Sequence, residues 1–152
     1  FEIVDGKVVC QNGGQMSCYV NAPELTANVL KDGKIYTNDL AHIDDDGMLV
    51  IEGRDGDVIN VGALKVSPSE VESVALAFPA VSDCICLPKS HPVMGNIVRL
   101  LIVPKDADSF DKQQLVQHIA ARLENYKVPQ SIELVDAIKR TYNGKLDRKA
   151  YQ

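Results

Sequence analysis

Three charged side chains stand in short polar stretches of this 152-residue chain, and together they combine one acceptor with two kinds of cation. Asp39 lies in "YTNDL", Arg54 in "GRDGD" and Lys145 in "NGKLDR" near the end. A carboxylate only accepts hydrogen bonds, a guanidinium donates from a rigid fork, and an ammonium is a compact point charge. Taken singly, each has a plain structural explanation: a turn cap for Asp39, an ion pair with an acidic neighbour for Arg54 and a solvated loop cation for Lys145.

The presentation of Lys145 is the most distinctive of the three. It directly follows Asn143 and Gly144, a pair that is typical of tight turns. Glycine adopts backbone angles that other residues avoid, so a short loop of this kind can approach another group closely and move as a unit. The sequence therefore predicts a turn near the C-terminus that presents one lysine.

Composition and charge exclude several classes of protein. The chain is 45% hydrophobic and 24% charged, which is typical of a soluble globular domain. Its net charge of -5 argues against electrostatic binding of nucleic acid or an anionic membrane. No stretch approaches the roughly 20 apolar residues of a membrane helix, and the first residues lack the pattern of a secretory signal. We expect a cytoplasmic protein with no membrane span and no nucleic-acid partner.

The metal-binding residue types do not form a recognisable site. The four cysteines, Cys10, Cys18, Cys84 and Cys86, include no Cys-x-x-Cys pair, which disfavours structural zinc. The last two share one face of an expected strand, where small buried thiols are common. The three histidines are scattered, and the aspartates at 44–46 indicate a solvated turn rather than a calcium loop, which needs ligands spread over about twelve residues. We expect no metal ligands in this chain.

The first 53 residues are mostly β-structure. Asp5 and Gly6 separate two short alternating runs, which predicts a hairpin. A short helix is expected next, with Asn21 as its cap and Gly33 as its stop. Strand-like pieces follow at residues 34–36, 41–43 and 48–52. This region has no obvious core of its own and is typical of the end of a larger domain.

The character of the chain changes after the charged, glycine-containing cluster at residues 53–57, where we place a domain boundary. A helix is expected to begin at a capping box formed by Ser67 and Glu70. Two strands ("VSDCICLP" and "NIVRLLIVP"), a helix ("SFDKQQLVQHIAARLE"), a strand ("SIELVD") and a short terminal helix follow. This order predicts an α+β fold, in which a small sheet is packed with helices.

In this order and spacing, the three charged stretches resemble the adenylate-forming superfamily, which comprises acyl-CoA synthetases, adenylation domains of peptide synthetases and luciferase-like enzymes. The resemblance covers nearly the whole chain, and the two segments that carry it are residues 18–72 and 123–151. It implies that residues 1–53 are the tail of a large N-terminal adenylation domain, that residues 54–57 are a hinge and that residues 58–152 are a mobile C-terminal domain.

The resemblance also implies roles for the three charged residues. Asp39 matches an aspartate that accepts hydrogen bonds from the ribose hydroxyls of ATP or AMP, a role that suits an acceptor-only carboxylate. Arg54 matches an arginine on the ribose side of the nucleotide. Lys145 matches a lysine that bridges the substrate carboxylate and the nucleotide oxygens, where negative charges converge and a preplaced cation lowers the barrier.

Further roles follow from the same resemblance. Gly56 lies where the family has its hinge, usually Asp or Lys, and glycine is a competent pivot. Gly62 and Lys65 match a loop along the path of the thiol-bearing pantetheine arm, although the same segment also reads as a strand followed by a capped helix. Asn38 replaces the glycine that usually precedes the nucleotide aspartate, and asparagine tolerates positive φ.

The function that the resemblance implies is that of an AMP-forming acyl-CoA synthetase, with ATP, a carboxylic acid and CoA as substrates. The phosphate loop and the adenine contacts belong to the N-terminal domain, which would be the partner of this chain. Mg²⁺ would be held outside these residues, and the chain alone is expected to be inactive. One alternative is an adenylation domain that loads a phosphopantetheinyl carrier protein. Another is a non-catalytic regulatory or binding module, against which the joint presence of the three charged residues argues.

Overall fold

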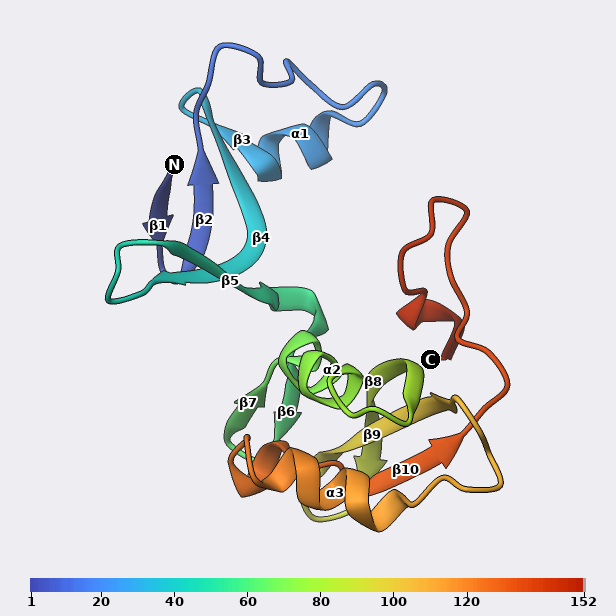
Figure 1. The fold of residues 1–152 in the computed structure, drawn as a ribbon. Helices are drawn as coiled ribbons and strands as arrows, with labels where there is room; N and C mark the ends of the chain where they lie inside the picture. Colours follow the sequence, from blue (N-terminus) through green and yellow to red (C-terminus); the bar gives the residue numbers. More distant parts are fainter. Residues whose placement is uncertain (152) are drawn as a thin grey trace. The chain divides into compact units, whose positions relative to one another are not determined.

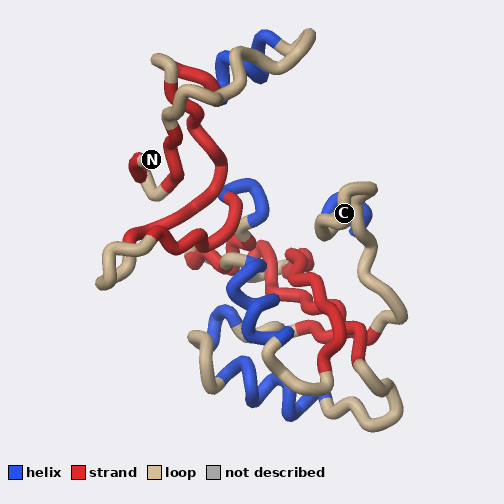
Figure 2. Tube along the Cα trace, turned by 45° about the horizontal axis from the view of Figure 1, so that its top comes forward, coloured by secondary structure: helices blue, strands red, loops and turns tan. Residues whose placement is uncertain are grey.

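The computed structural model describes residues 1–151 and consists of two compact units, Phe1–Gly56 and the residues from Asp57 onward. Helices and strands are both present, so the predicted α+β class is confirmed. Strands predominate in the first unit, and the second unit carries the longer helices (Figure 2). Within residues 1–151 the helices are all too short or too polar to span a bilayer.

The first unit begins with the expected hairpin. Strands β1 (Glu2–Val4) and β2 (Lys7–Cys10) pair antiparallel (Figure 1). Asp5 and Gly6 form the turn with φ values of 51° and 75°. Positive φ at both central residues gives the turn a twist that matches the paired strands. The hairpin prediction is confirmed.

The helix that follows differs from the prediction at both ends. Helix α1 (Pro23–Val29) has Ala22 at its cap position, and Asn21 precedes it with φ at 56°, so Asn21 is not the cap. The helix ends before Gly33, because strand β3 (Leu30–Lys31) already pairs with the next strand. Gly33 has a φ of 70° in the turn that joins these two strands. Cross-strand pairing, rather than a glycine stop, ends the helix.

The rest of the first unit is built on one long strand. Strand β4 (Lys34–Ile43) joins the two predicted pieces at 34–36 and 41–43, and strand β5 (Leu49–Arg54) pairs antiparallel with it. The Asp44 carboxylate accepts backbone hydrogen bonds from Asp46 and Met48, which confirms the solvated turn. The sheet order is β1-β2-β4-β3, with β5 also on β4.

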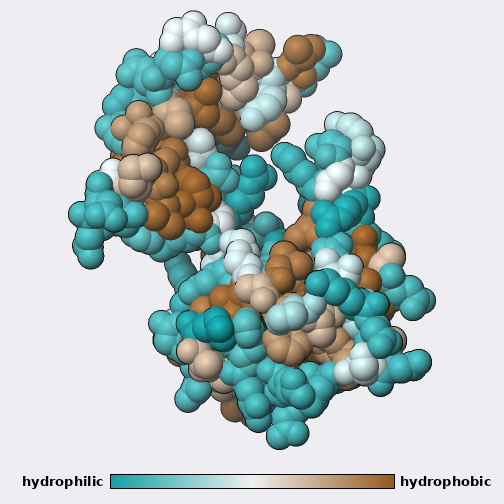
Figure 3. Space-filling view, in the orientation of Figure 1, coloured by the Kyte–Doolittle hydropathy of each residue, from teal (hydrophilic) through white to brown (hydrophobic). Residues whose placement is uncertain are grey.

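The core of the first unit is small. Val8, Val9 and Ala41 are its buried apolar side chains among the described residues. Other apolar side chains, including Phe1, Val4, Ile43, Met48 and Ile51, are exposed. Figure 3 shows hydrophobic atoms gathered on the visible face of this unit. An apolar surface of this kind is typical of a face that another structure covers.

The second unit opens with a hairpin of two strands, where a single strand was predicted. After the short 3-10 helix η1 (Asp55–Asp57), strands β6 (Ile59–Val61) and β7 (Leu64–Val66) pair through a turn at Gly62. Helix α2 (Pro68–Leu76) begins where predicted. The capping box does not form within the described residues, because the Ser67 hydroxyl bonds to Ser69 and Glu70 binds Lys127 instead.

The remaining elements follow the predicted order. Strands β8 (Val81–His91) and β9 (Gly95–Pro104) pair along their whole length, and strand β10 (Ser131–Leu134) lies parallel to β9. Helix α3 (Lys112–Ala120) is capped by the side chain of Asp111. The 3-10 helices η2 (Asn125–Lys127) and η3 (Arg148–Tyr151) complete the unit.

Alternation along β8 and β9 gives the second unit two apolar layers. Cys84 and Cys86 belong to the larger cluster, to which both helices also contribute buried side chains. Ile85, Leu87 and Leu101 belong to a second cluster. Residues of the C-terminal segment complete this cluster: Val135, Ile138, Leu146 and Tyr151. The apolar side chains of the C-terminal segment therefore pack in this second cluster, separate from the cluster to which α2 and α3 contribute.

Candidate functional site

Asp39 and Arg54 are direct partners in the ladder between β4 and β5. Arg54 Nε donates a 3.0 Å hydrogen bond to Asp39 Oδ1, and the two side chains remain 63% and 35% exposed. The backbone N–H of Asp39 also donates to the Thr37 hydroxyl. An ionised carboxylate has about four acceptor positions, so one bond to Arg54 leaves capacity for the hydroxyl groups of a ligand.

Lys145 lies in a small hairpin that is closed by its own backbone. The Arg140–Leu146 bridge forms the base, the N–H of Gly144 donates to the Thr141 carbonyl, and the N–H of Thr141 donates to the Lys145 carbonyl. Gly144 has a φ of 80°, which favours glycine. The backbone of Lys145 is thus fixed locally, while its side chain is exposed.

Both arms of this hairpin are attached to strand β8 by arginines. On the first arm, Arg140 Nη2 lies 2.6 Å from Asp83 Oδ2, and Arg140 Nη1 donates to the Gly144 carbonyl. On the second arm, Arg148 Nη1 donates to the Cys86 carbonyl on β8. The hairpin is therefore held on each side of the lysine.

Arg148 is the centre of a partly buried network. Its two terminal nitrogens lie 2.7 and 2.9 Å from the two carboxylate oxygens of Glu72, and its Nε lies 3.3 Å from Asp57 Oδ2. Glu72, only 6% exposed, also accepts the backbone N–H of Cys86. Burial lowers the pKa of Arg148, but Glu72 and Asp57 outweigh this effect and raise it. The guanidinium is therefore always charged.

The expected thiol-path residues lie in the β6–β7 hairpin. Gly62 has a φ of 61°, and its N–H donates a 2.8 Å hydrogen bond to the Met94 carbonyl. Lys65 is exposed on β7, opposite Asn60. The positive φ of the turn favours glycine at this position. Lack of space does not, because an added Cβ would meet only Met94, at an ordinary contact distance of 3.5 Å.

Gly56 lies between two aspartates that are each attached to their own unit. Asp55 pairs with Lys7 at 2.8 Å in the first unit, and Asp57 pairs with Arg148 in the second. A Cβ placed on Gly56 would meet no described atom within 4 Å. The boundary between the two compact units falls directly after this glycine.

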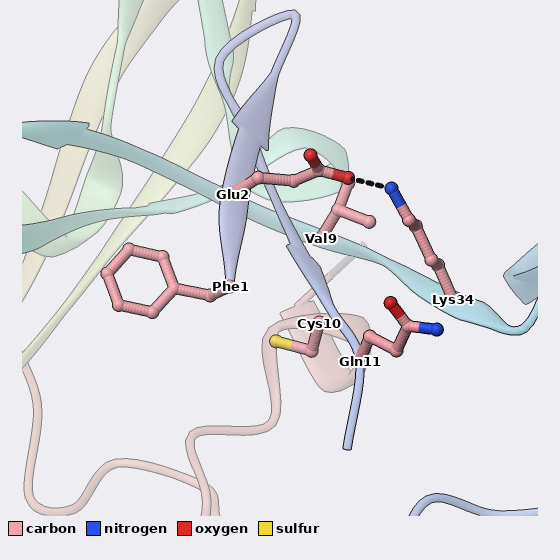
Figure 4. Close-up of a pocket in the computed structure, with 6 residues that line it drawn as sticks. All are labelled: Phe1, Glu2, Val9, Cys10, Gln11 and Lys34. Carbon is pink, nitrogen blue, oxygen red and sulfur yellow. Dashed lines mark hydrogen bonds and ion pairs between the residues drawn. The ribbon is translucent and has the colours of Figure 1, made fainter.

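The candidate residues are therefore divided between the two units. The first unit brings Asp39 and Arg54 together, and the second holds Lys145, Gly62 and Lys65. A separate pocket in the first unit is lined by six residues: Phe1, Glu2, Val9, Cys10, Gln11 and Lys34 (Figure 4). An ion pair of 2.7 Å joins Glu2 and Lys34 there. No candidate residue lines this pocket.

The metal-binding residue types are dispersed in residues 1–151, where no group of three His, Cys, Asp or Glu side chains is arranged to hold an ion. Cys84 and Cys86 are buried, as the strand pattern predicts. Burial raises the pKa of the Cys84 thiol from 9.0 to about 12, and it raises the pKa of Cys86 as well. Neither thiol is activated for chemistry.

The residues that hold the Lys145 hairpin were not predicted from the sequence. In the sequence analysis, no role was assigned to Arg140, Arg148 or Glu72. One signal was present: Glu72 directly follows Val71, which is fully buried, and lies three residues before Ala75, which is also buried. A carboxylate on the buried face of a helix indicates a buried cationic partner.

Comparison with known proteins gives a consistent match. The family model described as the AMP-binding enzyme C-terminal domain matches residues 70–145. A feruloyl-CoA synthase from Amycolatopsis is 33% identical over 141 residues, which cover 93% of this chain and 29% of that protein. The chain spans less than a third of the length of this relative.

Two solved structures extend the match to the fold. An amide bond synthetase from Marinactinospora thermotolerans has a TM-score of 0.88 at 32% identity, covering 96% of this chain and 30% of its own. The o-succinylbenzoate CoA synthetase from Bacillus subtilis, in complex with its acyl-adenylate intermediate, has a TM-score of 0.91 at 25% identity. It covers all of this chain and 31% of its own length.

Proposed function

Because the chain belongs to the family of AMP-binding enzyme C-terminal domains, we propose that it works as the C-terminal part of an AMP-forming acid–thiol ligase. The CoA ligases among its relatives support this general kind of activity. The partner of the chain is then a larger N-terminal domain that supplies the phosphate loop, the adenine contacts and the acid pocket. Mg²⁺ would also be bound by that domain.

The proposed reaction has two steps. In the first, a carboxylate oxygen of the acid forms a bond to the α-phosphorus of ATP, and the bond from that phosphorus to the bridging oxygen breaks, which releases pyrophosphate. In the second, the sulfur of a thiol bonds to the acyl carbon, AMP leaves with the electron pair of the broken C–O bond, and the thiol proton passes to the medium. The products are a thioester and AMP.

The observation that carries the proposal is the exposed Asp39–Arg54 pair. Asp39 is proposed to accept hydrogen bonds from the two ribose hydroxyls, and Arg54 to hold that carboxylate and contact the sugar side of the nucleotide. Their direct cross-strand pairing and their exposure suit a ligand that bonds to both. Neither side chain is withdrawn into the core, so both are available for this role.

Lys145 is proposed to place its ammonium between the carboxylate of the acid and the phosphate oxygens during the first step. Negative charges converge there, and a cation fixed in advance stabilises the transition state without reorganisation. The locally closed hairpin fixes the backbone of Lys145 and leaves the long side chain exposed. This combination suits a cation that enters a pocket on another domain.

The second step is proposed to use another part of the second unit, the β6–β7 hairpin. Rotation about Gly56 would withdraw Lys145 and bring Gly62 and Lys65 to the thiol path. The attachment of Asp55 and Asp57 to different units is consistent with a pivot at the residue between them. Lys65 is exposed and can meet the phosphates of CoA.

The test is Lys145→Ala in the longer enzyme that contains this chain. We expect acid-dependent exchange of pyrophosphate into ATP to fall on the order of 10²-fold or more, because a cation aimed at the transition state is lost. Thioester formation from supplied acyl-adenylate should stay within a few fold. Lys149→Ala, four residues later and also exposed, is the matched control. Equal loss of both steps would contradict the proposed role.

A carrier protein remains the alternative acceptor, because "NGKLDRKA" is also similar to adenylation domains that load phosphopantetheinyl carriers. The CoA ligases among the relatives favour CoA. The assay above separates the two when free CoA and a phosphopantetheinylated carrier are supplied in parallel. We expect turnover with free CoA.

A further inference from the structure

We propose that Glu72 and Arg148 are positioning residues for Lys145. Their ion pair fixes the position of the hairpin and the direction in which its tip presents the lysine. This inference rests on the proposed catalytic role of Lys145. It concerns residues that do not touch substrate and act only through the hairpin.

The hairpin needs an external support, because its internal bonds do not determine where it points. The bonds of Thr141 with Gly144 and Lys145 close the turn on itself. Tyr142, at the tip, is fully exposed. The direction of the tip is therefore set by the two arms, and a displacement of about 1 Å at a reacting group costs about 10²-fold in rate.

Arg148 is the strongest attachment on these arms. It stands three residues after Lys145, so the intervening chain cannot extend beyond roughly 10 Å. Its guanidinium meets Glu72 with two parallel bonds, a geometry that fixes orientation as well as distance. Only 18% of the Arg148 side chain is exposed, so water competes little for these bonds.

Glu72 connects this attachment to two further elements. It projects from α2 and accepts the backbone N–H of Cys86, while Arg148 donates to the Cys86 carbonyl. Among the described strands β8 pairs only with β9, so both groups of Cys86 lie on its open edge. The ion pair therefore fills the place of a missing neighbouring strand and ties the C-terminal arm to α2 and β8 at one point.

Asp57 gives the attachment a direct connection to the start of the second unit. Its carboxylate lies 3.3 Å from Arg148 Nε, and it directly follows Gly56. The arginine that supports the lysine hairpin thus also holds the first residue after the proposed pivot. A turn of the unit about Gly56 would carry the hairpin with it as one body.

Stability alone is a weak explanation for such a pair. Burying two charges carries a large desolvation penalty, and well-packed apolar residues often serve a fold as well. A pair that only stabilised the domain would affect both steps of the proposed reaction equally, because both need a folded second unit. A pair that positions Lys145 affects the first step selectively, and this difference can be measured.

The experiment compares Glu72→Gln and Arg148→Lys with Glu70→Gln in the longer enzyme that contains this chain. The Gln side chain keeps the acceptor for the Cys86 N–H but loses the negative charge that orients Arg148. The Lys side chain keeps the positive charge but loses the two parallel hydrogen bonds to Glu72. Glu70 is the matched control: it lies on the same helix and binds Lys127, 57 residues away. Each protein is assayed for pyrophosphate exchange and for thioester formation from supplied acyl-adenylate.

We call Glu72→Gln and Arg148→Lys the anchor variants. We expect both to lose 10-fold or more in pyrophosphate exchange, while thioester formation stays within about threefold. Glu70→Gln should change neither activity. Amide hydrogen exchange should quicken at residues 139–151 in the anchor variants and stay unchanged in Lys145→Ala. This readout detects loss of attachment without any assay of activity.

Two results would overturn the inference while leaving the proposed function intact. One is exchange activity within twofold of the parent for both anchor variants when Lys145→Ala is inactive. The other is an equal loss of both steps, which would make the pair a purely structural element. If Lys145→Ala itself retains full exchange activity, the proposed role of the lysine and this inference fail together.

Discussion

Two arginine–carboxylate pairs in this chain have the same chemistry and opposite surroundings. Arg54 and Asp39 meet through one hydrogen bond on an exposed strand pair, and 63% of the arginine side chain is open to solvent. Arg148 and Glu72 meet through two bonds, with 18% and 8% of their side chains exposed. The first pair keeps capacity for a ligand, and the second uses its capacity inside the fold.

The difference indicates how to read a charged pair in a family of this kind. Exposed pairs contribute little to stability, and their unused hydrogen-bonding capacity stays available to a ligand. Buried pairs with extra hydrogen bonds hold separate segments in one arrangement, and removing one partner is costly. The contrast predicts that changes in the Arg148–Glu72 pair mainly lower stability, whereas changes in the Arg54–Asp39 pair mainly weaken ligand binding.

The largest expected effect on stability comes from Arg148→Met. This change leaves the buried Glu72 carboxylate without its cation, which should lower the free energy of unfolding by about 3 to 5 kcal/mol. Adding Glu72→Gln should recover more than half of that loss, because the neutral amide still accepts the Cys86 N–H. Urea unfolding followed by circular dichroism measures both proteins. A double variant no more stable than Arg148→Met would show that the unpaired charge is not the cause.

An intermediate effect on stability is expected from Arg140→Ala, on the other arm of the Lys145 hairpin. The side chains of Arg140 and Asp83 are 44% and 27% exposed, so the loss should be about 1 kcal/mol in the free energy of unfolding. The ion pair should weaken as KCl rises from about 0.1 to 1 M, because the Debye length falls from about 10 to 3 Å. Asp83→Asn should lose about as much, and a salt-independent loss in both variants would argue against an electrostatic attachment.

The smallest effect on stability is expected from Arg54→Lys and Asp39→Asn, at less than about 1 kcal/mol. In the proposed ligase, the same changes should weaken ATP binding 10-fold or more, because a proposed ligand contact is lost. Titration calorimetry measures this affinity. Glu52→Gln is the control, since Glu52 binds His42 at 2.9 Å on the same two strands. Unchanged affinity in both variants would remove the pair from the proposed nucleotide site.

Local patterns predicted much of the second unit. The apolar runs of β8 and β9 and the facing side chains Leu115 and Ile119 of α3 gave the correct elements, because burial imposes these periods directly. The hairpin at Asp5 and Gly6 was equally clear. Where strand pairing decides the outcome, prediction failed: the end of α1 depends on the pairing of Leu30 with Ile35, which lies outside the helix itself.

The candidate site was predicted from motifs and only in part. Asp39, Arg54 and Lys145 were identified from the resemblance, but the direct pairing of the first two depends on the register of β4 and β5. Glu72 and Arg148 are 76 residues apart in the chain, and no local pattern connects them. Contacts of this length arise from the packing of α2 and the C-terminal segment around the edge of β8.

The placement of the cysteines gives each unit a different response to thiol reagents. Cys18 is exposed and Cys10 is partly exposed in the first unit, whereas Cys84 and Cys86 are buried in the second. The thiolate is the nucleophile that attacks alkylating reagents, and burial keeps that form rare in the second unit. Iodoacetamide will therefore mark the first unit at once and the second only when its core opens, so the mass of each peptide over time records the opening rate of the domain that carries Lys145.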